Sequence, residues 1–221
     1  REEYVLGNLG RNARLHASAA EPLTMIVKDF DNNGYVEQLI GMYNGGKQYP
    51  LVLRDDLIKT VPPWKARFLN YKDYALKTLD DVVAPAERTS AVVKQAYRFE
   101  SVIMKRTAGG AFQFEALPLE AQLAPVFGIS TADVNGDGKL DVLLGGNFDG
   151  VKPELGRMAS SEGLLLLGDG SGALRAMRPA DSGFRVPGQT RAIVRVKGRT
   201  GVRFVAARNS ARPLVFSLGR P

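Results

Sequence analysis

The sequence contains no cysteine, one histidine (His16) and one tryptophan. Without cysteine, a disulfide scaffold, a zinc–thiolate site, an iron–sulfur cluster and a cysteine nucleophile are all excluded. A single histidine cannot build a multi-histidine metal centre, and a Ser-His-Asp triad would have to use His16. We expect His16 to be a surface or hydrogen-bonded structural residue rather than a catalytic base.

Long apolar runs are also missing. The densest, residues 163–167, is far too short to span a bilayer, so no transmembrane segment is predicted. No phosphate-binding loop of the GxxxxGK type occurs. Because the sequence begins at Arg1 rather than Met, we expect it to be a piece of a longer chain, whose export signal cannot be read here.

The composition is that of a folded domain with a basic balance. Of 221 residues, 44% are hydrophobic and 24% charged, and 30 Lys and Arg against 23 Asp and Glu give a formal net charge of +7. This charge permits contact with polyanions. The basic residues are spread along the chain, and in residues 191–212 they alternate with apolar residues as in a strand. We therefore expect a solvated strand face there, and nucleic acid is not an expected partner.

The chain resembles itself at several places. Residues 103–118 and 165–179 share an apolar strand, a Gly-rich turn, an alternating strand and a final proline, and both are predicted to be β-hairpins. Residues 44–53 and 209–216 share an Asn-led turn followed by proline and a short apolar strand. The combined unit of about 60 residues has the size of one four-stranded propeller blade.

These repeats predict an all-β fold with a helical insert, made of about three four-stranded, propeller-type blades that form a partial propeller or part of a larger one. In the insert, Trp64, Phe68 and Leu69 lie on one face of a helical pattern, and Asp55-Asp56 and Asp80-Asp81 are expected to cap helix starts. The whole of residues 1–221 is predicted to be a single segment, divided into repeat 1 (about 20–54, continuing at 95–120), the insert (about 55–94), repeat 2 (about 121–180) and repeat 3 (about 181–221).

Two loops have the oxygen-rich pattern of a cation site. Each places oxygen side chains at positions 1, 3, 5 and 9, a glycine at position 6 and a backbone carbonyl at position 7. Alternate residues of a tightly curled loop point inward, and all-oxygen donors with flexible geometry favour Ca²⁺ over Mg²⁺. The sequence therefore predicts two Ca²⁺ sites, one formed by Asp29, Asp31, Asn33, Tyr35 (carbonyl) and Glu37, the other by Asp133, Asn135, Asp137, Lys139 (carbonyl) and Asp141.

Two other interpretations compete with these sites. A helix-loop-helix calcium site needs a carboxylate at position 12 and helices on both sides. Position 12 is instead Ile40 or Leu144, and the flanks are short and apolar, as strands are. Alternatively, the loops are Asx-rich turns that hold no metal. In the third repeat, residues 197–203 carry cations where the acidic loop would be, so no calcium is predicted there.

The second loop and its flanks resemble a known repeat. Phe127-Gly128, the loop 133–141 and the Gly-rich exit 142–147 are similar to the FG-GAP or VCBS-type repeat of integrin-alpha-like β-propellers, although Gly145-Gly146-Asn147 departs from the family's Gly-Ala-Pro. The first unit matches only in its loop and following strand. The resemblance implies that calcium braces a loop between two strands of a blade. It also implies an exported protein, such as the bacterial surface proteins whose relatives carry an ASPIC/UnbV domain.

Together these features predict a non-catalytic, calcium-binding β-propeller module of an extracytoplasmic bacterial protein, with no catalytic residues. Its role would be scaffolding or binding of a protein or carbohydrate ligand, beside other blades or domains of a longer chain. Millimolar calcium outside the cytoplasm would keep weak sites filled. Two alternatives stay open: a polysaccharide hydrolase or lyase using Glu115 or Glu120, and a polyanion-binding module using the Arg-rich last repeat. Trp64, Tyr71 and Tyr74 would form either a sugar platform or the packing of the insert.

Overall fold

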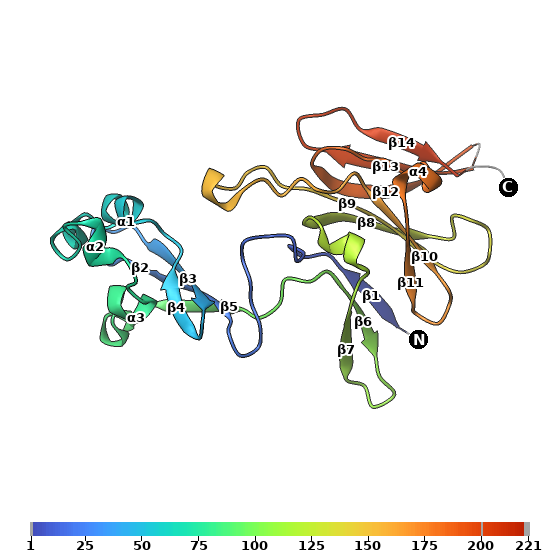
Figure 1. The fold of residues 1–221 in the computed structure, drawn as a ribbon. Helices are drawn as coiled ribbons and strands as arrows, with labels where there is room; N and C mark the ends of the chain where they lie inside the picture. The colour runs from blue at the N-terminus through green and yellow to red at the C-terminus, as the bar shows by residue number, and fades with distance from the viewer. Residues whose placement is uncertain (1, 200, 219–221) are drawn as a thin grey trace. The chain divides into compact units, whose positions relative to one another are not determined.

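The structure is a computed structural model that describes residues 2–199 and 201–218 (Figure 1). The predictions for residues 1, 200 and 219–221 lie outside the described part. Strands account for 38% and helices for 16% of the structure, so the chain is mainly β, as predicted. It forms two compact units, which we call the large unit (Arg1–Arg14 with Phe99–Pro221) and the small unit (Leu15–Arg98). No helix in the described residues is long and apolar enough to cross a membrane.

The large unit contains three antiparallel sheets with the strand orders β1-β6-β7, β11-β10-β9-β8 and β12-β13-β14. Short helical turns η3 (Leu119–Gln122) and α4 (Pro179–Ser182) connect successive sheets, and η4 (Pro153–Leu155) lies between β9 and β10 of the middle sheet. The strands are β1 (Glu3–Leu6), β6 (Val102–Arg106), β7 (Phe112–Ala116), β8 (Val126–Ala132), β9 (Asp141–Gly146), β10 (Leu164–Gly168), β11 (Leu174–Met177), β12 (Thr190–Gly198), β13 (Gly201–Arg208) and β14 (Leu214–Ser217).

The middle sheet of the large unit is buried on both faces. All six residues of β9 are buried, because side chains that point to opposite faces enter two different cores. Leu143 and Leu165 contribute to a core shared with Ile193 and Phe204 of the last sheet. Val142, Leu144 and Leu166 contribute to a second core shared with Ile103 of the first sheet; it also includes Leu117 and Ala121. The apolar runs of β9 and β10 thus explain the stacking of three sheets.

The small unit consists of one antiparallel sheet and a run of short helices. Its sheet has the order β4-β3-β2-β5 and comprises β2 (Leu23–Lys28), β3 (Glu37–Asn44), β4 (Lys47–Pro50) and β5 (Val92–Ala96). The helices are α1 (Arg54–Thr60), η1 (Pro62–Ala66), α2 (Tyr71–Tyr74), α3 (Leu79–Val82) and η2 (Pro85–Arg88).

The helices of the small unit pack on one face of its sheet. Leu39 from β3 joins a core with Leu57, Trp64, Phe68 and Val82 of the helical region. Trp64 is only 6% exposed and contacts Phe30 with a ring-centroid distance of 5.1 Å. Tyr74 is partly buried, and its hydroxyl donates to the carbonyl of Val52. The insert therefore uses Trp64 and Tyr74 for packing, and a sugar platform of Trp64, Tyr71 and Tyr74 is not formed.

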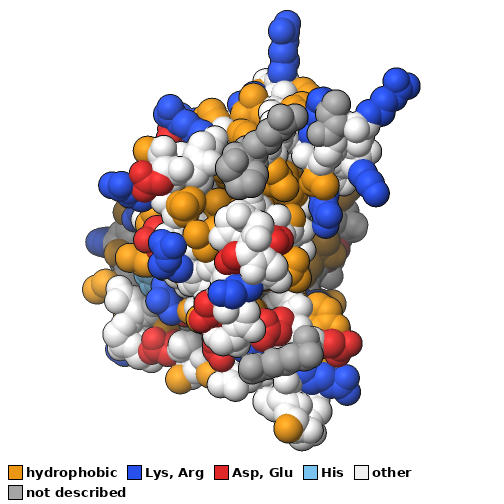
Figure 2. Space-filling view, turned by 90° about the vertical axis from the view of Figure 1, so that its right-hand side faces the viewer, with side chains coloured by type: hydrophobic (Ala, Val, Ile, Leu, Met, Phe, Trp, Pro, Cys, Tyr) orange, Lys and Arg blue, Asp and Glu red, His pale blue; other side chains and the backbone are white. Residues whose placement is uncertain are grey.

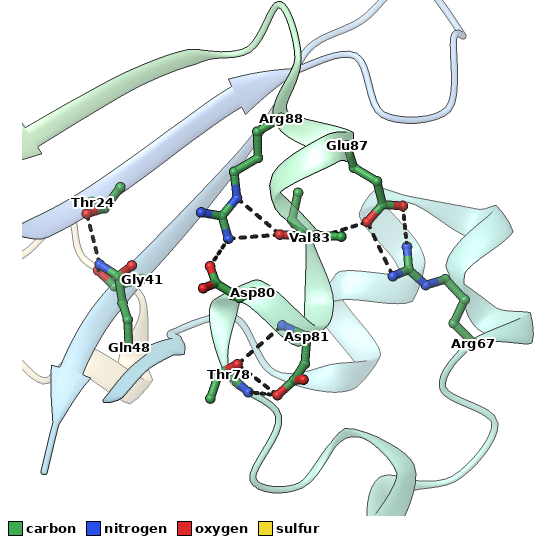
Figure 3. Close-up of polar contacts among 11 residues, drawn as sticks. Thr24, Gly41, Gln48, Arg67, Thr78, Asp80, Asp81, Val83, Glu87 and Arg88 are labelled. Carbon is green, nitrogen blue, oxygen red and sulfur yellow. Dashed lines mark hydrogen bonds and ion pairs between the residues drawn. The ribbon is translucent and has the colours of Figure 1, made fainter. Parts of the chain in front are cut away.

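Polar contacts fix the last helices of the insert (Figure 3). Thr78 and Asp81 cap the start of α3 reciprocally, as predicted for Asp81. Arg88 pairs with Asp80, and Arg67 pairs with Glu87. Asp55 and Asp56 lie in the first turn of α1, at the predicted helix start, but the cap position is held by Leu53 without a side-chain bond, so the predicted capping by these aspartates is not formed.

The predicted units differ in how their strands pair. Both hairpins form, as β6–β7 and β10–β11, and repeat 2 is a four-stranded antiparallel sheet in sequence order. The continuation of repeat 1 at 95–120 differs from its first half, because β6 pairs with β1 of the large unit while β5 pairs with β2 of the small unit. The described part of repeat 3 contributes three strands rather than four.

Candidate metal centre

Each of the two acidic loops connects two neighbouring antiparallel strands. The first lies between β2 and β3 in the small unit, and the second lies between β8 and β9 in the large unit. In both, the residue before position 1 pairs with position 9: Lys28 with Glu37, and Ala132 with Asp141. The prediction of strands on both sides is confirmed, and a helix-loop-helix site is excluded.

The two loops also have the same backbone path. Position 4 has a positive φ in each, 58° at Asn32 and 80° at Gly136. Position 6 is a glycine with φ of 90° at Gly34 and 81° at Gly138. A Cβ at either of these two glycines would meet no atom within 4 Å, so backbone conformation rather than lack of space requires glycine there.

In the first loop, backbone N–H groups hold the side chains at all four predicted positions. Asp29 accepts from Gly34 N at 2.8 Å, and Asp31 accepts from Asn33 N at 3.2 Å. Asn33 accepts from Tyr35 N at 2.8 Å. Glu37 is buried and accepts from the N–H of Phe30 at 2.8 Å. Position 1 thus bonds to position 6, position 3 to 5, position 5 to 7, and position 9 to 2.

The second loop repeats this scheme at every position. Asp133 accepts from Gly138 N at 2.9 Å, and Asn135 accepts from Asp137 N at 3.0 Å. Asp137 accepts from Lys139 N at 2.9 Å. Asp141 accepts from the N–H of Val134 at 2.9 Å. Two hairpins in separate units therefore bond the side chains at the same four loop positions to the backbone in the same way.

The loops differ in how closely their carboxylates converge. Asp29, Asp31 and Glu37 each place an oxygen within 4.8 Å of the others. Among the described residues, these three form the group of acidic side chains whose oxygens are this close. Asp133, Asp137 and Asp141 of the second loop do not form such a group. One reason is the second bond of Asp141, which is fully buried and also accepts from the N–H of Gly168 at 3.0 Å. Position 3 of the second loop is moreover the neutral Asn135.

Backbone N–H groups also favour the charged carboxylates. The N–H of Gly34 lowers the pKa of Asp29, and the N–H of Lys139 lowers the pKa of Asp137. Both groups are therefore negatively charged at neutral pH. Lys28 adjoins the first loop. Its ammonium group donates hydrogen bonds to the carbonyls of Glu87 and Thr89, so it is bound at the η2 region.

Tyr35 and Lys139 occupy position 7, where the sequence predicts a carbonyl ligand. Their side chains are exposed, and their N–H groups bond to position 5 as described above. In the last sheet, the β12–β13 hairpin ends with Lys197 paired to Val202 and Gly198 paired to Gly201.

The Gly-rich exit of the second loop has a structural role that sequence reasoning missed. A Cβ at Gly146 would lie 1.6 Å from the carbonyl oxygen of Pro125, so no other residue fits there. Asn147 is buried, has a φ of 76°, and bonds to the backbone of Ser161 and Gly188. The partners of Asn147 lie 14 and 41 residues further along the chain, so no local sequence pattern marks them.

The comparisons with known proteins identify no relative: neither the protein-family models nor the curated proteins give a match to this chain.

Proposed function

We propose that this chain is a non-catalytic calcium-binding β module of the FG-GAP or VCBS type, with one Ca²⁺ in each acidic loop. The observation that carries the proposal is the shared geometry of the loops. Two hairpins of identical register, in two units with separate cores, use the same four side-chain bonds to the backbone. In the first loop, three carboxylate oxygens also lie within 4.8 Å of one another; like charges repel at that distance, and a bound cation would offset the repulsion.

The donor set favours calcium over other ions. All predicted side-chain donors are carboxylate or amide oxygens, which suit hard cations, and neither loop contains histidine or cysteine. Bound Ca²⁺ would offset the repulsion among Asp29, Asp31 and Glu37 and would link β2 to β3. In the second loop it would link β8 to β9. Calcium would thus act as a structural brace at the end of each hairpin.

The middle sheet of the large unit supports a propeller-blade assignment. Strands β8 to β11 form an antiparallel sheet in sequence order, with the acidic loop between the first and second strands. We propose that this sheet is one blade and that the three-stranded sheets packed on its two faces are its neighbours in a propeller. The module would serve as a scaffold or bind a protein or carbohydrate ligand outside the cytoplasm, where millimolar calcium fills weak sites.

No specific contact favours a polysaccharide hydrolase. The carboxylate of Glu115 pairs with the ammonium of Lys105, which is 9% exposed, so Glu115 has the surroundings of a structural ion pair. Trp64 is buried in the insert and offers no ring face to a sugar.

Calorimetric titration of the full chain with CaCl₂ tests the proposal together with thermal unfolding in calcium and in excess chelator. We expect two bound ions and a higher Tm with calcium, since ligand at one hundred times its Kd stabilises by about 2.7 kcal/mol. Asp31→Asn and Asp137→Asn are each expected to weaken one site. Glu21→Gln and Glu120→Gln remove exposed carboxylates outside the loops and serve as matched controls. An unchanged Tm and no heat of binding would contradict the proposal.

A further inference from the structure

The excess positive charge of the protein is confined to its last 40 residues. Residues 182–221 contain nine of the 30 Lys and Arg and none of the 23 Asp and Glu. Residues 1–181, with the other 21 Lys and Arg, therefore carry a formal net charge of −2. The basic residues are spread along the chain, as expected from the sequence, but the acidic residues are not, and their absence from the last 40 residues produces the local excess of positive charge.

Many of the cations in residues 2–181 pair with carboxylates: Arg11, Arg54, Arg67, Arg88, Lys105, Arg106, Arg157 and Arg178. In the last segment, Arg185 pairs with Glu162. Within the last segment, Arg191 stacks on Phe127 at 4.6 Å and donates to the carbonyl of Asn147. Arg208 donates to the carbonyls of Pro187 and Arg212. These three cations of the last segment, Arg185, Arg191 and Arg208, have structural partners.

The β12–β13 hairpin carries a different set. Arg195, Lys197 and Arg199 are exposed and form no ion pair with a carboxylate in the residues that the structure describes. Arg195 and Lys197 lie on the same side of β12, about 7 Å apart from the rise of a strand. Arg203 is exposed on β13, opposite Val196. In Figure 2, Lys and Arg side chains project from the top of the face shown, at the height at which Figure 1 draws β12 to β14.

We infer that the end of the β12–β13 hairpin, which we call the basic hairpin (residues 195–199 and 201–203), binds an extended polysaccharide that carries sulfate or carboxylate groups. Guanidinium groups form bidentate hydrogen bonds with such anions, and an ammonium group adds a point charge. Several cations at strand spacing on an exposed protrusion can contact successive anionic groups of one polymer.

The residues between these cations distinguish polysaccharide from other polyanions. Sequence-tolerant binding of single-stranded nucleic acid uses exposed aromatic rings on which bases stack. Residues 195–203 contain no Phe, Tyr or Trp, and the next residue, Phe204, is buried. Insertion into a lipid surface requires bulky apolar side chains at the leading edge, whereas Gly198, Arg199 and Gly201 form the described part of the tip.

Heparin, a sulfated polysaccharide, is the probe. Binding of the full chain to immobilised heparin is measured without calcium, from about 50 to about 200 mM NaCl. We expect Arg195→Gln with Lys197→Gln and Arg199→Gln to weaken binding at least about tenfold and to lower the salt slope by about two to three. Lys59→Gln with Lys65→Gln and Lys72→Gln removes the same charge from exposed positions of the small unit and should change binding less than about twofold.

Equal losses in the two triple variants, or no salt-dependent binding by the unchanged protein, would overturn the assignment. Arg195→Lys with Arg199→Lys keeps the charge and should retain most of the affinity, which separates loss of the site from loss of folding. A DNA duplex and vesicles containing anionic lipid are measured in parallel. Tighter binding to either one than to heparin would show that the hairpin serves that class instead.

Discussion

At the scale of single residues, glycines with positive φ shape the acidic loops. Gly138 has a φ of 81° and no neighbouring atom that a Cβ would meet. Gly109, in the exposed turn between β6 and β7, also has free space around it, but it is not among the glycines with positive φ. The two positions therefore differ in backbone conformation alone.

Gly138→Ala is expected to lower the free energy of unfolding by about 1–2 kcal/mol, because an L-residue is strained in the left-handed region. It should also weaken calcium binding at the second loop. Urea unfolding followed by circular dichroism measures the first effect, and calorimetric titration measures the second. Gly109→Ala is the control and should leave stability unchanged or slightly increased. Similar losses in both variants would show that the loop conformation is not the cause.

At the scale of elements, the close contact of β12 with β8 and β9 depends on small residues and leaves one polar group without a partner. A Cβ at Gly145 would lie 2.7 Å from Cγ2 of Thr190, so Thr190 can pack at this distance only because residue 145 is glycine. Thr190 is fully buried, and its hydroxyl has no hydrogen-bond partner among the described residues. Thr24 of β2 is also buried, but its hydroxyl accepts from the amide of Gln48 at 2.8 Å (Figure 3).

Thr190→Val is expected to raise the free energy of unfolding by about 1 kcal/mol, since it removes an unsatisfied buried hydroxyl while keeping the shape of the side chain. Thr24→Val should lower it by about 1 kcal/mol, because the amide of Gln48 loses its acceptor. Chemical denaturation of both variants beside the unchanged protein measures the difference. If Thr190→Val destabilises as much as Thr24→Val, the contact of the two sheets depends on that hydroxyl after all.

At the scale of the whole molecule, the two acidic loops belong to units with separate cores. Stabilisation by an ion spreads through the cooperative unit that contains its ligands. The proposed calcium sites should therefore act independently, each on its own unit.

Hydrogen exchange of the full chain, measured by mass spectrometry with and without calcium, tests this independence. In Asp31→Asn, calcium should still slow exchange in residues 133–141 but not in 29–37, and Asp137→Asn should give the reverse. The unchanged protein should show protection in both segments. Loss of protection in both segments from either single variant would show that the two sites are coupled.

The sequence by itself determined local structure wherever a short motif carries its own physical requirement. The Asp-Asn-Gly loops, the strands beside them, both Gly-turn hairpins and the helical insert follow from turn chemistry and hydrophobic periodicity, which act between residues close in the chain. The positions of Asp29, Asp31, Asn33 and Glu37 and of their counterparts could be predicted for the same reason. The segregation of charge into residues 182–221 was also present in the sequence and needed only a count by segment.

Only the tertiary structure decided which strands share a sheet and how far each carboxylate is available. The pairing of β6 with β1, and of β5 with β2, depends on residues far apart in the chain, so no local pattern marks it. Asp141 and Glu37 hold equivalent loop positions, yet Asp141 also bonds to Gly168 of another strand while Glu37 converges with Asp29 and Asp31. Long-range packing sets that difference, because it selects among partners that the sequence alone leaves equally accessible.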